Sequence, residues 1–200
     1  FSKDPMQYVD LSEWQHELLE AEETKIGREY WRLKDFTAMS TLTLPFENQG
    51  DGKSKFEPHC LDWTIDSDIV AKVKAFVHES HTSTRVFLLT CWLVTLKRLI
   101  GQSELIVGVG NDGRKYEELK EPLGLLAKYL PLHCHLEGRA SFMEILEQVH
   151  QVTDDIEQWQ ECFSWEQIAG QRSGEKGEAS FFPFCFDCEK PPTHPLPPPV

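Results

Sequence analysis

Residues 86–136 hold four consecutive patterns that decide the fold: VFLLTCWLV (86–94), LIVGVG (105–110), DGR (112–114) and LGLLAKYLPL (123–132). The first is apolar nearly all round a helix, which indicates a helix buried on several sides. The second is short, branched and free of charge, as in a fully buried strand. A glycine-containing turn then leads to a second apolar strand. A helix, a buried strand, a turn and another strand in this order predict an α/β fold.

Other segments extend the pattern on both sides. Ser141 and Glu144 form a capping box ahead of an amphipathic helix, and Asp10 and Glu13 form a similar pair near the start of the chain. Helices therefore alternate with buried strands, which predicts a mixed sheet covered by helices. The expected elements are helices starting at residues 10, 67, 83 and 141, and strands at 60–65, 105–109, 130–136 and 181–186.

These patterns resemble the condensation domains of nonribosomal peptide synthetases. YVDLSEWQ (8–15), Tyr30-Trp31 and Leu44-Pro45 are similar to the segment that opens the second half of that family's fold. The resemblance covers most of residues 8–188 and implies a chloramphenicol-acetyltransferase-like sandwich lobe. Residues 1–188 are expected to be the C-terminal part of a condensation-type domain. Residues 189–200 are rich in proline and are expected to be a linker or tail.

The resemblance also implies a reaction and its partners. Condensation domains transfer a carrier-bound acyl or peptidyl group, held as a phosphopantetheine thioester, onto a carrier-bound amine, and so form an amide bond. The phosphopantetheine arms of peptidyl or acyl carrier proteins are the substrates, and no cofactor is expected to bind directly. In the family the two arms enter a tunnel between two lobes from opposite faces.

The family's catalytic signature is missing from this sequence. That signature is two adjacent histidines followed, three residues on, by Asp-Gly, whereas no two histidines are adjacent here. No catalytic residue is therefore assigned, and the catalytic histidine is expected in an N-terminal lobe of the same domain, outside this sequence. The chain is expected to supply tunnel wall and a docking surface for carriers. A non-catalytic recruitment or docking module of the same fold is the alternative.

The segment at 123–132 supplies the candidate site. The family commonly has a phenylalanine, a valine and an asparagine where this sequence has Leu126, Ala127 and Lys128. Leu126, Lys128 and Tyr129 are therefore the residues expected to line the tunnel or contact substrate. The alternative is that Lys128 is a solvated charge and Tyr129 a packed ring.

Five further residues are expected to serve structure. Asp112, Gly113 and Arg114 match the family's turn after the strand. Gly113 is expected to adopt a positive φ, and Arg114 is expected to reach a carboxylate across the lobe. Gly124 and Pro131 match the family's Ile-Gly and Leu-Pro-Leu positions.

Composition narrows the possible partners. Lys and Arg number 20 against 33 Asp and Glu, a formal net charge of -13, which disfavours nucleic acid and anionic membrane surfaces. The longest apolar run, residues 86–94, is far shorter than the roughly 20 residues of a bilayer-spanning helix.

The six cysteines are expected to be reduced thiols of a cytoplasmic protein. Cys185 and Cys188 form a lone Cys-x-x-Cys, which favours half-buried strand cysteines over a zinc site.

Two pairs of clustered histidines have structural explanations. His78 and His81 fall at the end of a predicted helix, where positive charge is favourable. His133 and His135 alternate along a predicted strand. Neither pair is assigned to catalysis, and no metal site is predicted.

Overall fold

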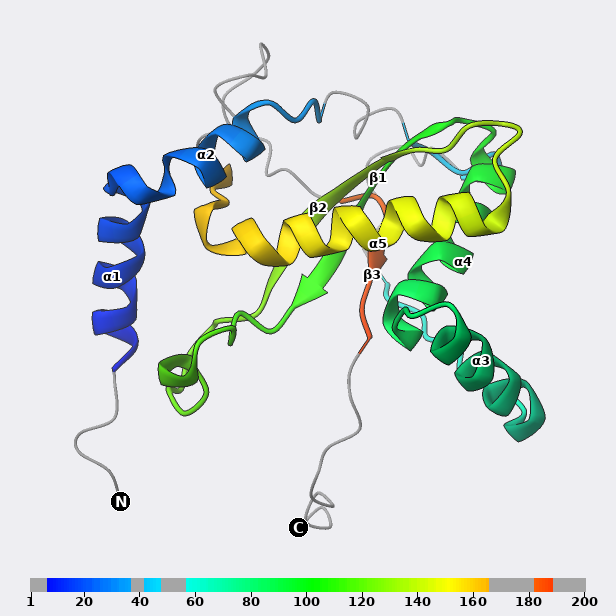
Figure 1. The fold of residues 1–200 in the computed structure, drawn as a ribbon, viewed down its shortest axis with the longest axis horizontal. Coiled ribbons are helices and arrows are strands. Elements are labelled where there is room, and N and C mark those ends of the chain that lie inside the picture. Colours follow the sequence, from blue (N-terminus) through cyan, green and yellow to red (C-terminus); the bar gives the residue numbers. More distant parts are fainter. Residues whose placement is uncertain (1–6, 37–41, 48–56, 166–181, 189–200) are drawn as a thin grey trace.

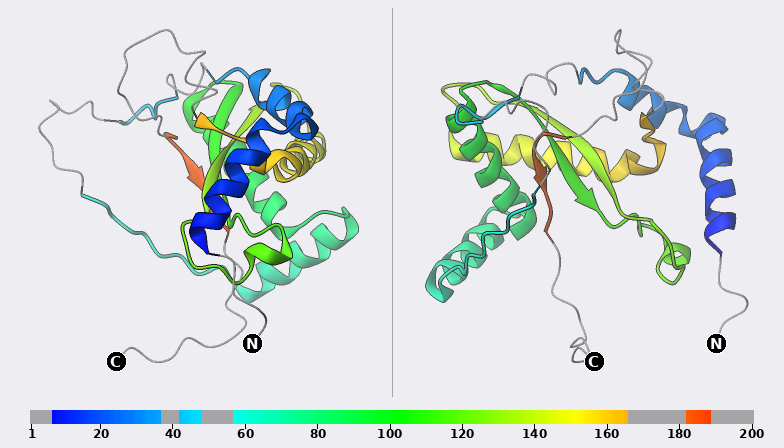
Figure 2. Two further views of the ribbon diagram at one scale, coloured as in Figure 1. Left: turned by 90° about the vertical axis from the view of Figure 1, so that its left-hand side faces the viewer. Right: turned by 180° about the vertical axis from the view of Figure 1, so that it is seen from behind.

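The structure, a computed structural model, has the α/β architecture predicted from the sequence (Figure 1). It describes residues 7–36, 42–47, 57–165 and 182–188. One long helix, α5, lies across the sheet, with α1 and α2 at one end of it and α3 and α4 near the other (Figures 1 and 2). The helices are α1 (Tyr8–Glu20), α2 (Lys25–Arg32), α3 (Ser67–Glu79), α4 (Thr84–Ile100) and α5 (Phe142–Trp159).

The sheet is mixed, as predicted, and has the strand order β2-β1-β3. β1 (Glu104–Asn111) and β2 (Lys128–His135) form an antiparallel hairpin that is paired over the full length of both strands. β3 (Cys185–Phe186) runs parallel to β1 on its other side. The strands predicted at 105–109 and 130–136 are thus confirmed with shifted ends. Of the strand predicted at 181–186, the structure confirms the last two residues; residues 182–184 are not part of the strand, and residue 181 lies outside the described residues.

The two longest helices begin where the sequence predicts. Ser83 caps α4 by accepting a hydrogen bond from the Val86 backbone N–H, and Gly101 follows its last residue with a φ of 78°. Ser141 and Glu144 form the predicted capping box of α5. These caps satisfy backbone N–H groups that have no partner within the first turn of a helix.

Two other helices start differently from the prediction. Gln7 is the N-cap of α1, and Asp10 is the third helical residue, where its carboxylate accepts the Gln7 N–H at 2.9 Å. The capping box therefore joins Gln7 to Asp10, not Asp10 to Glu13. At α3 the cap is Asp66, not Ser67. A charged carboxylate is a stronger acceptor than a hydroxyl, which favours the aspartate.

The strand predicted at 60–65 is absent. Residues 57–66 form neither helix nor strand, and all of them are exposed. Their apolar and polar residues do alternate, but no strand of the described chain pairs with them. The prediction is wrong for this structure because a strand needs a partner as well as a pattern.

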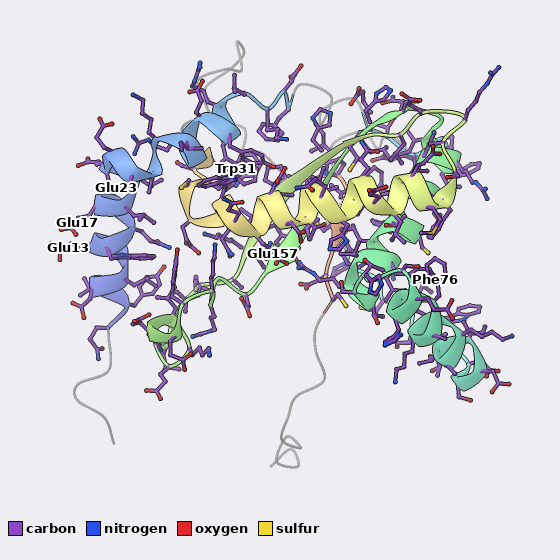
Figure 3. The ribbon with its side chains drawn as sticks, viewed as in Figure 1. Glu13, Glu17, Glu23, Trp31, Phe76 and Glu157 are labelled. Carbon is purple, nitrogen blue, oxygen red and sulfur yellow. The ribbon has the colours of Figure 1, made fainter. Side chains whose placement is uncertain are left out.

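The main core lies between the sheet and the helices. Trp31 of α2 is buried, and its indole N–H donates to the Trp159 carbonyl at 2.8 Å, which fixes α2 at the end of α5 (Figure 3). Burial of each large aliphatic side chain contributes about 1.5–3 kcal/mol. The fully buried aliphatic residues include Leu89, Leu93, Leu96, Leu105, Ile106, Val107, Leu130, Leu132, Leu136 and Val149. Within the described residues, no helix has both the length and the apolar character needed to cross a membrane.

A second, smaller cluster holds the long β1–β2 connection against α1. Leu119 and Leu126 of the connection are buried with Leu11 of α1, and Trp14 packs beside them. Trp14 also meets Tyr116 edge-to-face, with 5.7 Å between the ring centres. The connection is therefore packed against a helix along part of its length.

The same connection begins with the predicted glycine turn. Gly113 has a φ of 67°, as expected, and a Cβ there would overlap the Leu126 carbonyl. Among the described residues Arg114 pairs with no carboxylate across the lobe, contrary to the prediction. Its guanidinium donates to the carbonyls of Leu119, Lys120 and Pro122. One guanidinium has several donors in a fixed fork, so it satisfies carbonyls that no strand pairs with.

At the opposite end of the hairpin, Glu104 bridges two histidines of β2. Its carboxylate oxygens lie 2.6 Å from His133 Nε2 and 2.5 Å from His135 Nδ1. Hydrogen bonds from His133 and then His135 hold the pKa of Glu104 below its ordinary value of 4.5. The two histidines therefore join the start of β1 to the end of β2.

We predict that Glu104 makes stability depend on pH in the acid range. Its pKa is lower in the folded chain, so its contribution is complete above 4.5 and is lost as the pH falls through the lower, folded value. Glu104→Gln should lower the free energy of unfolding near neutral pH and should match the parent once the pH is below the folded pKa of Glu104. Denaturant titrations from acid to neutral pH measure the free energy of unfolding of the parent and of the variant. A difference in the free energy of unfolding between parent and variant that stays constant with pH would contradict the prediction.

Candidate functional site

A pocket of about 680 Å³ lies where β1 ends and β2 begins. Its wall combines the hairpin with the start of α4, the end of α5 and the residues just after β3. Three cationic side chains and three carboxylates line it. The lining residues are Arg85, Gly110, Asn111, Asp112, Lys115, Ala127, Lys128, Tyr129, Glu157, Gln160, Asp187 and Cys188. The structure therefore brings two of the predicted tunnel residues, Lys128 and Tyr129, into one pocket.

Lys128 is held by a buried carboxylate. Its Nζ lies 2.9 Å from Oε2 of Glu161, whose side chain is only 6% exposed. The other oxygen of Glu161 is also buried, and it has no hydrogen-bond partner within the described chain. A buried charge is costly without a compensating partner. Lys128 is thus the ion-pair partner of Glu161 and not a freely solvated charge.

Tyr129 is half exposed and turns towards β3. Its hydroxyl donates to Oδ2 of Asp187 at 3.1 Å. The Asp187 carboxyl group lies over the backbone of Gly110, where an added Cβ would come within 2.8 Å of it. Gly110 therefore leaves the space that the carboxylate occupies. Tyr129 is not a packed core ring, because 42% of it is exposed.

Two further cations form an ion pair and hydrogen bonds that connect the segments of the pocket wall. Arg85 of α4 pairs with Glu157 of α5 at 3.0 Å and also donates to the Gly110 carbonyl. Lys115 Nζ donates to the carbonyls of Glu157 and Gln158, both at 3.1 Å. Figure 3 places Glu157 on the edge of α5 nearest the hairpin. These bonds join the hairpin to α4 and α5 around the pocket.

The other predicted residues lie outside the pocket, apart from Asp112. Leu126 packs in the second cluster, and its neighbour Ala127 lines the pocket in its place. Gly124 lies against the Tyr8 ring so closely that a Cβ would overlap it. Pro131 is buried in β2, opposite Gly108 of β1. Asp112 lines the pocket and accepts the Arg114 backbone N–H at 2.9 Å.

Sequence reasoning missed five charged residues of the site: Arg85, Lys115, Glu157, Glu161 and Asp187. Each lies on a different segment from Lys128, so no local spacing links them to it. Polar residues on an amphipathic helix look the same in sequence whether they face a pocket or solvent. The one available signal was Lys128 itself, a charge in a largely apolar segment, because such a charge needs an acidic partner.

The pocket is suited to hydrogen bonding. Its donors and acceptors sit on paired strands and packed helices, an arrangement that fixes the orientation of a polar ligand. None of the histidines in the described residues lines it: His133 and His135 are at the far end of the hairpin, and His78 and His81 are at the end of α3. In the described part of the chain, no group of three or more His, Cys, Asp or Glu side chains could hold a metal ion.

All six cysteines lie in described residues and are free thiols. Cys188 lines the pocket and is partly buried, whereas Cys185 is exposed. Burial raises the pKa of Cys134 to about 12, so that its thiol stays protonated at neutral pH. The cysteines therefore form no disulfide framework.

Known proteins share both sequence and fold with this chain. The condensation-domain family model matches residues 1–180. Bacitracin synthase 3 of Bacillus licheniformis is 28% identical over 144 residues, which is 72% of this chain and 2% of that protein. Malpinin synthetase of Mortierella alpina is 28% identical over 148 residues, 74% of this chain and 2% of that protein.

Two solved structures show the same fold. The condensation domain from the Monacolin K polyketide synthase MokA superposes with a TM-score of 0.67 at 20% identity, covering 88% of this chain and 42% of that one. The X-domain from teicoplanin biosynthesis has a TM-score of 0.65 at 17% identity, covering 84% and 39%. The chain thus spans about two fifths of these solved chains and only 2% of each of the two synthetases.

We predict that Lys128→Ala lowers the free energy of unfolding by about 3–5 kcal/mol, because it leaves the Glu161 carboxylate buried without its partner. The double variant Lys128→Met with Glu161→Gln should lose much less, since both charges are gone. Urea unfolding of the single and double variants measures the difference. Equal stability of the two would show that Glu161 does not need Lys128.

Proposed function

The chain belongs to the condensation-domain family, and we propose that residues 1–188 are the C-terminal part of a domain that forms amide bonds in nonribosomal peptide biosynthesis. In the proposed reaction, the nitrogen of a carrier-bound amine attacks the carbonyl carbon of a carrier-bound acyl or peptidyl thioester. The C–N bond forms as the C–S bond breaks, and the phosphopantetheine thiol leaves. The amine gives its proton to a base positioned beside it.

The position of the pocket is the observation that carries this proposal. It lies in the segment whose sequence resembles the family's tunnel segment, and Lys128 and Tyr129 line it. A phosphopantetheine arm carries amide groups, which need donors and acceptors in fixed places. Tyr129 with Asp187, and Lys128 with Glu161, supply such groups. We assign them to binding and orienting an arm or its acyl group, and not to proton transfer.

The base is assigned to polypeptide outside this chain. No pair of adjacent histidines occurs in the 200 residues. The proposed domain therefore includes an N-terminal lobe that carries the catalytic histidine and closes the tunnel. Peptidyl or acyl carrier proteins are the proposed partners, and the cytoplasm is the proposed location. Residues 189–200, which lie outside the described residues, are proposed to be a proline-rich linker or tail.

A docking module is the second candidate. One structure that shares the fold is the X-domain in its complex with OxyB from teicoplanin biosynthesis, with a TM-score of 0.62. That fold can therefore hold another protein on its surface. The lack of adjacent histidines in this chain is consistent with such a role.

The test compares the 200-residue chain with the natural protein that carries it. Each is mixed with an acylated carrier and an aminoacylated carrier, and the amide product is followed by mass spectrometry. We predict product with the natural protein and none above background with the chain alone. Product from the chain alone would overturn the assignment of the base to other sequence. No product from either protein, across a panel of acyl and aminoacyl groups, would favour the docking module.

We further predict that Tyr129→Phe in the active protein lowers turnover about fivefold, the equivalent of one hydrogen bond of about 1 kcal/mol. The variant keeps the ring and loses only the hydroxyl that donates to Asp187. Circular dichroism serves as the control for folding. Unchanged turnover with two different donors would return Tyr129 to a purely structural role.

A further inference from the structure

One segment has the sequence of a strand, but no strand of the described residues lies beside it. Leu61, Trp63 and Ile65 alternate with polar or small residues and are 98%, 92% and 51% exposed. Alternate side chains of an extended chain point to one face, so these three form an apolar face. A contiguous exposed apolar surface on a soluble protein marks an interaction site, whereas single exposed residues do not.

The backbone of this segment is also unpaired within the described part of the chain. None of residues 58–65 makes a backbone hydrogen bond to another described residue. In the left view of Figure 2, the segment (cyan) stands clear of the sheet and of the helices. A row of free N–H and C=O groups is a template for a further strand. The segment therefore offers both parts of a strand contact, the backbone and an apolar face.

We infer that residues 58–65 form a strand with the sheet edge of the polypeptide that completes the condensation-domain fold. The inference rests on the proposed function in one respect, which is that residues 1–188 belong to a larger domain. The solved chains with this fold are more than twice as long as the part that this chain matches, 42% of one and 39% of another. Those chains thus contain ample polypeptide to supply the edge.

A strand edge fits the segment better than the other occupants. A helix or a lipid surface would cover Leu61 and Trp63 but would leave the backbone groups unsatisfied. A second copy of the segment would give a two-stranded ribbon, which is marginally stable in water. An edge of an existing sheet satisfies the backbone and buries the apolar face together.

Hydrogen exchange tests the inference directly. Backbone amides of residues 59–65 should exchange at nearly unprotected rates in the 200-residue chain. In the natural protein that carries this chain, the same amides should exchange at least about 100-fold more slowly, as in a paired strand. Fast exchange in that protein, while its other strands are protected, would overturn the inference. Protection that rises with the concentration of the 200-residue chain would also overturn it, because the partner would be a second copy.

Two variants separate the apolar face from the opposite face. Leu61→Glu should restore fast exchange in the natural protein, whereas Thr64→Glu, on the other face, should keep the protection. Neither should change the melting temperature of the 200-residue chain, because both residues are exposed there. Loss of protection with both variants would overturn the assignment of the apolar face.

The outcome is independent of catalysis. A protected segment in a protein without condensation activity would support the strand and remove the proposed function. An unprotected segment in a protein that has condensation activity would overturn the strand and support the proposed function.

Discussion

The antiparallel register of β1 and β2 is the constraint on which the site depends. Asn111 faces Lys128 and Gly110 faces Tyr129 in the ladder, so the two halves of the pocket meet at one end of the hairpin. Side chains alternate along a strand, which sends Lys128 towards Glu161 and Tyr129 towards Asp187 on the other side. A slip of one residue would exchange these directions.

Several bonds then keep the open end of the hairpin in place. Arg114 donates hydrogen bonds to three carbonyls of the β1–β2 connection. The small cluster around Leu119 packs that connection against α1. Lys115 donates to carbonyls at the end of α5, where the helix dipole favours a positive charge. The pocket is thus built from elements that are distant in sequence and tied by specific donors. Such a wall can hold a ligand in one orientation without an ordering cost at each encounter.

The cations of the pocket are already paired with acceptors of the chain. Arg85, Lys115 and Lys128 each have a carboxylate or carbonyl partner. This arrangement suits a neutral, amide-containing arm better than a strongly charged ligand, because these cations are already neutralised or hydrogen-bonded. The apolar face at residues 58–65 is a different feature, since it lacks any partner in the described chain. The first feature bears on the proposed ligand of the pocket, and the second bears on the inferred strand contact.

The sequence by itself determined the fold class, the hairpin strands, the caps of α4 and α5, the positive φ of Gly113 and the family. These features depend on local patterns: apolar periodicity, capping side chains and a glycine that a left-handed turn requires. Tertiary structure alone decided the partners of Lys128, Tyr129 and Arg114, because those partners come from other segments or from backbone carbonyls. It also decided that residues 60–65 form no strand. An alternating pattern shows that a segment can pair, but pairing depends on whether another strand lies within hydrogen-bonding distance.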